Sequence, residues 1–75
     1  MTATFYLNKV TLLDGSGKSI PICPCLTGLQ ITTVGDTYSQ CQREAMVIFK
    51  RVHIKHHPED NLEYDFHIHP TSIIG

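Results

Sequence analysis

The chain has 75 residues, of which 41% are hydrophobic and 17% are charged, and its six Lys and Arg against seven Asp and Glu give a formal net charge of −1. This length predicts one small domain, residues 1–75, with a marginal core, and the hydrophobic content argues against disorder. The balanced charge argues against non-specific DNA binding, and no apolar run approaches the roughly 20 residues needed to span a bilayer.

The N-terminal part of the chain predicts a β-hairpin. Residues 4–13 are rich in aromatic and β-branched side chains and are expected to form a strand. The apolar positions change parity between Leu7 and Val10, which predicts a β-bulge near residues 8 and 9. Residues 14–17, Asp-Gly-Ser-Gly, are a strong turn signal because glycine accepts positive φ at little cost. Residues 19–22 are then expected to return as a second strand. Pro21 implies that this strand lies at an edge of the sheet or ends early.

The middle of the chain predicts a third strand and a short helix. Residues 29–34 alternate as a strand does, and Gly35 ends the run. In the next segment Asp36 is suited to cap a helix, and good helix formers follow with apolar residues near helical spacing. The alternative is a tight hairpin through residues 35 and 36, with residues 37–42 as a strand. Because alternation is poor there, we favour one short helix near residues 36–46.

Residues 47–69 show the clearest pattern, since two alternating runs flank the chain-breaking segment 57–61. In the second run the apolar residues share one parity and the polar residues the other: Leu62, Tyr64, Phe66 and Ile68 against Glu63, Asp65, His67 and His69. Strict alternation is typical of a strand with one buried face and one solvated face. The pattern therefore predicts a second hairpin, running through residues 47–69 and turning at residues 57–61.

Together these elements predict an α+β, β-rich fold. Its sheet is small and antiparallel, with four to five strands, hairpins around residues 14–17 and 57–61, and one short helix near residues 36–46. The connections are too short for the crossovers of a parallel sheet. A sheet of this size has open edges, and few residues are charged, so we expect a homodimer or a docked protein partner.

The outer face of the second predicted hairpin is the candidate partner-binding surface. It consists of Arg51, His53, Lys55, Asp65, His67 and His69. Residues 51, 53 and 55 are expected to form cross-strand charge pairs with Glu63 and Asp65. The row of residues 65, 67 and 69 also contains ordinary metal ligands, but charge pairing is the simpler interpretation, and we assign no metal site to it.

The cysteines give an alternative. Three cysteines are an odd set for a secreted disulfide scaffold, and no signal sequence is visible, so reduced thiols in the cytoplasm are expected. Cys23, Cys25 and Cys41, with a histidine such as His56 or His57, could supply a zinc site of the Cys₃His type. However, the single residue between the first two cysteines is tight for zinc, and buried cysteines often behave as small apolar residues. The main prediction therefore includes no cofactor.

The sequence does not predict an enzyme. The Gly-Lys-Ser at residues 17–19 is not a phosphate-binding loop because Leu12 stands where that motif requires glycine. No strained turn or third orienting group accompanies the cysteines and histidines, so no nucleophilic site is recognisable.

Small size, low charge and open sheet edges favour a non-enzymatic protein that docks onto another protein. Phages and viruses often encode small inhibitors or modulators of host proteins of this kind. One alternative is the zinc-stabilised or metal-binding regulatory domain. Another is a small β-barrel that binds single-stranded nucleic acid, stacking bases on exposed aromatic residues. The candidates for such stacking are Phe5, Tyr6, Tyr38 and Phe49.

Overall fold

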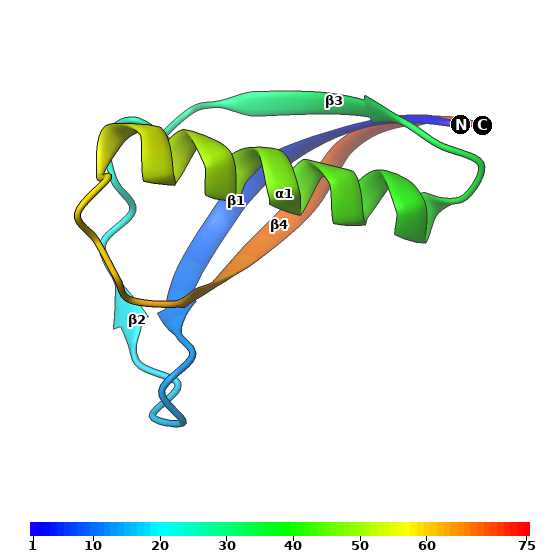
Figure 1. The fold of residues 1–75 in the computed structure, drawn as a ribbon. Helices are drawn as coiled ribbons and strands as arrows, with labels where there is room; N and C mark the ends of the chain where they lie inside the picture. Colours follow the sequence, from blue (N-terminus) through cyan, green and yellow to red (C-terminus); the bar gives the residue numbers. More distant parts are fainter.

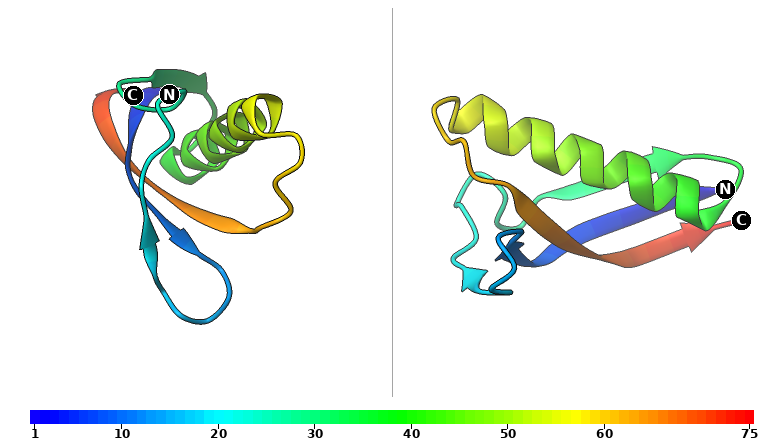
Figure 2. Two further views of the ribbon diagram at one scale, coloured as in Figure 1. Left: turned by 90° about the vertical axis from the view of Figure 1, so that its left-hand side faces the viewer. Right: turned by 60° about the horizontal axis from the view of Figure 1, so that its bottom comes forward.

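The computed structural model describes all residues, 1–75, as four strands and one helix (Figure 1). The elements are β1 (Thr2–Leu12), β2 (Ser19–Ile20), β3 (Gln30–Val34), α1 (Tyr38–His56) and β4 (Tyr64–Ile74). All four strands belong to one antiparallel sheet, and α1 lies across one of its faces (Figures 1 and 2). The predicted class, an α+β fold with a small antiparallel sheet and one helix, is confirmed.

β1 is the central strand of the sheet. β4 pairs with it on one side along almost its whole length, from Thr2 opposite Ile74 to Leu12 opposite Tyr64. The other side is shared, since β3 pairs with the first part of β1 and β2 with its last residues. This register places the two chain ends side by side at one end of the molecule (Figure 2). The outer edges of β3 and β4 are not paired with another strand.

The parity change predicted in β1 is a bulge. Leu7 pairs with Ile68 and Lys9 with His67, so Asn8 has no partner on β4. An extra residue in one strand shifts the alternation by one position. The apolar residues before and after the bulge therefore point to the same face of the sheet.

The first hairpin is also confirmed. Gly15 and Gly17 adopt φ values of 88° and 66°, and the Leu12 N–H donates to the Lys18 carbonyl at 3.0 Å. Glycine adopts positive φ at little cost, which is why residues 14–17 predict a turn. β2 is shorter than predicted and ends immediately before Pro21, which has no N–H to donate to a strand partner.

α1 begins close to the predicted helix start, with Thr37 rather than Asp36 as its N-cap. The Thr37 hydroxyl accepts a hydrogen bond from the Gln40 N–H at 3.2 Å, and the Gln40 side-chain oxygen accepts one from the Asp36 N–H at 2.8 Å. This reciprocal pair resembles the capping box of a Thr-x-x-Gln sequence. It satisfies two backbone donors at the start of the helix.

The second predicted hairpin is wrong, because residues 47–56 continue α1 and residues 57–61 connect the helix to β4. Cys41, Ala45 and Phe49 recur every four residues and are fully buried. This helical stripe packs against the sheet and outweighs the local alternation. The helix ends at the chain breaker because Pro58 disfavours helical backbone at the residue before it, and His57 has φ −135° and ψ 65°.

The second half of the predicted hairpin is a strand, β4, but its partner is β1. Phe66 and Ile68 are buried and Tyr64 is half-buried, as their parity predicted, whereas Leu62 precedes the strand and is exposed. The strand also continues to Ile74, beyond its predicted end at residue 69.

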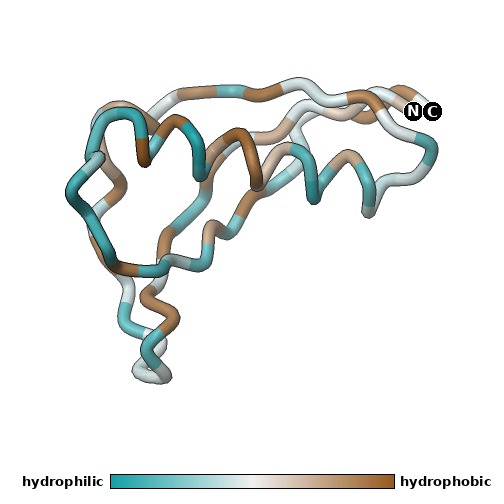
Figure 3. The backbone as a smooth tube through the Cα atoms, in the orientation of Figure 1, coloured by the Kyte–Doolittle hydropathy of each residue, from teal (hydrophilic) through white to brown (hydrophobic).

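The core lies between α1 and the sheet. Its largest fully buried side chains are Phe5, Leu26, Cys41 and Phe49. Thr33 is the one buried polar residue, and its hydroxyl donates to the Cys41 carbonyl at 2.7 Å. In Figure 3 a long hydrophilic stretch runs from the far end of α1 into the connection to β4. α1 does not combine the length and the apolarity needed to cross a membrane.

Candidate metal centre

The six residues predicted to form one partner-binding surface are distributed over three places. Arg51 and Lys55 are exposed on α1, whereas His53 is half-buried beneath the connection to β4. His67 and His69 alternate with buried residues of β4 and therefore belong to the sheet face away from α1, whereas the half-buried Asp65 also lines a hollow with Arg43 and Lys50 of α1. The cross-strand charge pairs are wrong because residues 51–55 are helical.

The β4 residues of this set do lie together on the open sheet face. His67 Nε2 is 3.0 Å from Thr11 Oγ1 and 3.4 Å from an Asp65 carboxylate oxygen. The His69 ring stacks on the Tyr6 ring, with centroids 5.8 Å apart. The predicted row is thus present, but its neighbours come from β1.

The structure brings together a different set, Cys23, Cys25 and His57. One ligand atom from each lies within 4.8 Å of the others. The Cys23 sulfur is 2.9 Å from His57 Nε2 and 2.8 Å from the Cys25 sulfur. Because Cys23 and His57 are 34 positions apart, the cluster is formed by the fold and not by local sequence.

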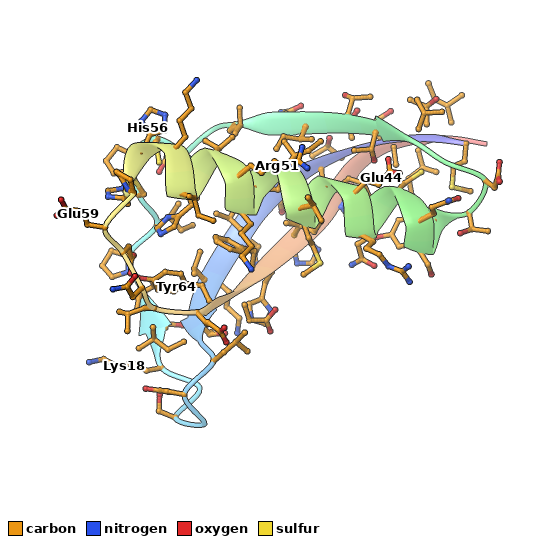
Figure 4. The ribbon with its side chains drawn as sticks, in the orientation of Figure 1. Lys18, Glu44, Arg51, His56, Glu59 and Tyr64 are labelled. Atoms are coloured by element: carbon orange, nitrogen blue, oxygen red, sulfur yellow. The ribbon has the colours of Figure 1, made fainter.

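Cys41, the third thiol of the predicted Cys₃His site, lies elsewhere. It is fully buried near the start of α1, where its sulfur is 3.6 Å from the Met1 carbonyl oxygen. The helical rise places it about 24 Å along the axis from His57. His56 is also outside the cluster and points outward at the end of α1 (Figure 4). The four-ligand site is therefore wrong, and three ligands remain.

The two cysteines are positioned by a turn between β2 and β3. The Leu26 N–H donates to the Cys23 carbonyl at 2.8 Å, and the Thr27 N–H and hydroxyl donate to the same oxygen, each at 3.2 Å. Gly28 completes the turn with φ 76°. The Leu26 side chain is fully buried in the core. This anchor fixes the turn against the domain and leaves the thiols at its half-buried outer side.

The thiols differ strongly in acidity. The hydrogen bond from the Cys25 thiol, together with that from His57, lowers the pKa of Cys23 to about 7. Burial and the hydrogen bond to Cys23 raise the pKa of Cys25 to about 11. Near neutral pH, Cys23 is therefore the thiol best able to supply a thiolate.

A second polar group, His53, Asp60 and Tyr64, organises the connection to β4. One Asp60 oxygen lies 3.1 Å from His53 Nε2 and accepts the Tyr64 hydroxyl at 2.5 Å, and the other accepts the Leu62 N–H at 2.9 Å. The Tyr64 hydrogen bond is the main cause that lowers the pKa of Asp60 to about 2. The same bond raises the pKa of Tyr64 to about 12.

The two polar groups are adjacent. The rings of His53 and His57 have centroids 5.0 Å apart, and the His53 ring is equally close, 5.0 Å, to the ring of Tyr64 at the start of β4 (Figure 4). Sequence reasoning had named the cysteines and His57, but it missed Asp60 and Tyr64. Their only signal was the position of Asp60 within the chain-breaking segment 57–61.

The cluster offers the donor set of a thiophilic metal. Two thiolates and one imidazole suit Zn²⁺ or Cu⁺, and three protein ligands leave a fourth position for solvent. The hollow beside His53 and Asp60 has a volume of only about 80 Å³, whereas ligand pockets usually measure about 300–1,000 Å³. No known protein family, characterised protein or solved structure is significantly similar to this chain.

Proposed function

We propose that this protein is a non-enzymatic domain that binds one zinc ion through Cys23, Cys25 and His57. The observation that carries the proposal is the convergence of two thiols and an imidazole, from two distant segments, within 4.8 Å. Solvent or a group from a partner protein occupies the fourth position of a tetrahedral zinc ion.

The observed spacing is close to that of a tetrahedral site. Zinc–sulfur bonds of about 2.3 Å and zinc–nitrogen bonds of about 2.0 Å set neighbouring ligand atoms about 3.5 Å apart. The contacts of 2.9 Å from Cys23 to His57 and 2.8 Å from Cys23 to Cys25 are shorter. The two Cys23 contacts therefore need to lengthen by less than about 1 Å, which rotation of the exposed His57 side chain and the Cys23 thiol provides. The third pair, Cys25 and His57, lies within 4.8 Å.

Binding has a structural consequence that suits a small domain. Zinc joins the turn between β2 and β3 to the end of α1, two segments whose ligands are 34 positions apart. A cross-link that closes a long loop restricts the unfolded chain, and domains of this size commonly depend on such links. Reduced thiols are required as ligands, which agrees with the predicted cytoplasmic location.

The test is metal binding by the purified chain. We expect one equivalent of zinc by elemental analysis, and intense d–d and thiolate-to-metal charge-transfer absorption on substitution with Co²⁺. Cys23→Ser, Cys25→Ser and His57→Ala should each weaken zinc binding beyond the roughly 10- to 100-fold typical of losing an outer-shell partner.

Two variants serve as matched controls. Cys41→Ala removes a thiol, and His56→Ala removes the neighbouring imidazole, yet neither residue belongs to the cluster. Both should retain one zinc ion. Wild-type protein that binds no zinc, or equal losses in His56→Ala and His57→Ala, would contradict the proposal. Circular dichroism of each variant separates loss of a ligand from loss of the fold.

Other functional predictions from the sequence remain predictions. Docking onto a host protein, in the manner of a phage or viral modulator, is supported by small size and open sheet edges. Binding of single-stranded nucleic acid has less support, since Phe5 and Phe49 are fully buried and cannot stack on bases. The homodimer is supported by a separate surface, described below.

A further inference from the structure

The exposed side of α1 carries an apolar ridge. The side chain of Val47 remains 46% exposed and lies between two shallow hollows of about 340 and 330 Å³. Arg43 lines both hollows, Arg51 lines the first, and Lys50 and the exposed Leu13 line the second. We call Leu13, Arg43, Val47, Lys50 and Arg51 the α1 patch. It combines an apolar centre with a border of three cations, beside which Glu44 lines the first hollow and Asp65 the second.

The cations of this patch have no partner within the chain. α1 carries four of the six Lys and Arg residues and only one of the seven acidic residues, Glu44. The helix is thus strongly positive, although the whole chain has a net charge of −1. The ion pairs of the structure, His53 with Asp60 and His67 with Asp65, involve no Lys or Arg. The patch therefore fits an acidic surface with an apolar centre.

The same chain has such a surface in the connection between α1 and β4. Leu62 is 63% exposed there, and Glu59 and Glu63 are exposed on either side of it in the sequence. Neither glutamate forms an ion pair, and Glu59 stands at the outer side of the connection (Figure 4). We call Glu59, Leu62 and Glu63 the acidic loop.

The α1 patch and the acidic loop are neighbours. Lys50 from the patch and Leu62 and Glu63 from the loop line the same small hollow. A two-fold interface requires one continuous surface that is complementary to itself, so that each copy supplies both halves. We propose that a second copy of this chain covers the α1 patch, with the acidic loop of each copy against the α1 patch of the other. The proposal does not depend on zinc.

Charge reversal tests the pairing. One variant carries Arg43→Glu and Arg51→Glu, and the other carries Glu59→Lys and Glu63→Lys. Each alone places like charges at both contacts, and we expect its dimer dissociation constant, measured by sedimentation equilibrium, to rise at least about tenfold. Mixed in equal amounts, the two variants should form a heterodimer, because both contacts then join opposite charges.

Matched controls change the same charge elsewhere. Lys9→Glu with Lys18→Glu alters two exposed cations of β1 and the first hairpin, and it should leave dimerisation unchanged. The measurements are repeated with EDTA and with zinc, so that dimerisation and metal binding fail or succeed separately.

Four outcomes overturn the proposal. The first is a wild-type monomer at millimolar concentration. The second is a dimer that neither reversal weakens, which points to another surface such as the β4 edge. The third is a monomer that binds an acidic peptide or an oligonucleotide through the α1 patch. Failure of the two variants to pair when mixed, while each remains folded by circular dichroism, also overturns it.

Discussion

The first three turns of α1 are attached to the sheet through Cys41, Ala45 and Phe49, none of which is exposed to solvent, whereas the helix has no fully buried residue from His53 onward. Its far end is held by polar contacts, from His57 to Cys23 and from His53 to Asp60, and by packing of the His53 ring against Tyr64 and Phe66. Apolar packing does not depend on pH or on metals. The polar contacts depend on pH and, under the zinc proposal, on metal as well, so we expect the sensitivity of this fold to its surroundings to be concentrated at one end of one helix.

The largest effect should come from the apolar end. Phe49→Ala removes a fully buried ring beneath α1, and we expect the free energy of unfolding to fall by about 3–5 kcal/mol. Ile54→Ala is the control, since Ile54 is 49% exposed on the same helix, and its cost should stay below about 1 kcal/mol. Urea unfolding followed by circular dichroism measures both.

This comparison also covers the case in which Phe49→Ala does not fold. Phe49→Leu keeps the site apolar and should cost about 1.5 kcal/mol or less. Similar losses in Phe49→Ala and Ile54→Ala would remove the distinction between the two ends of the helix.

An intermediate effect should come from zinc at the polar end. At a free zinc concentration a hundred times the dissociation constant, a ligand that binds only the native state stabilises it by about 2.7 kcal/mol. We expect this increment in wild-type protein and in Cys41→Ala. It should be absent in His57→Ala. Equal stabilisation of both variants by zinc would place the metal elsewhere and end the contrast between Cys41 and the cluster.

Local patterns were sufficient to predict much of the fold. Parity gave the bulge in β1 and the buried residues of β4, and the paired glycines gave the first hairpin. The pairing of β4 with β1 could not be predicted from the same patterns. Alternation shows that a strand has one buried face, but it does not show which strand lies beside it. The length of α1 was misjudged for a related reason. The four-residue spacing from Cys41 to Phe49 predicts a helix, whereas the alternation in residues 47–56 predicts a strand. In the structure the helix forms, because its apolar side chains are buried against the sheet.

The candidate site was only partly predictable. Cys23, Cys25 and His57 are ordinary metal ligands and were recognised by residue type, but spacing alone could not separate them from Cys41 or His56. Only the folded chain shows that the turn anchored by Leu26 meets the end of α1. The acidic loop and the α1 patch could not be predicted for the same reason. The charged residues of the patch share a face only because residues 47–56 are helical.

The smallest effect should be the pH dependence of the contact between Asp60 and Tyr64. The pKa of Asp60 is lowered to about 2, so its contribution to stability is full above about pH 4 and is lost as the pH falls toward 2. The pKa of Tyr64 is raised to about 12, so its contribution is full below about pH 10 and is lost as the pH rises toward 12. The contact therefore stabilises the fold on a plateau between these limits.

Tyr64→Phe tests this plateau because it removes the hydroxyl that Asp60 accepts at 2.5 Å. In EDTA, the stability difference between wild-type protein and Tyr64→Phe should be constant from pH 4.5 to pH 9.5 and shrink toward pH 2.5. Tyr6→Phe, on the open sheet face, should give no such change. A difference that persists undiminished at pH 2.5 would mean that the ionised carboxylate does not hold the connection to β4.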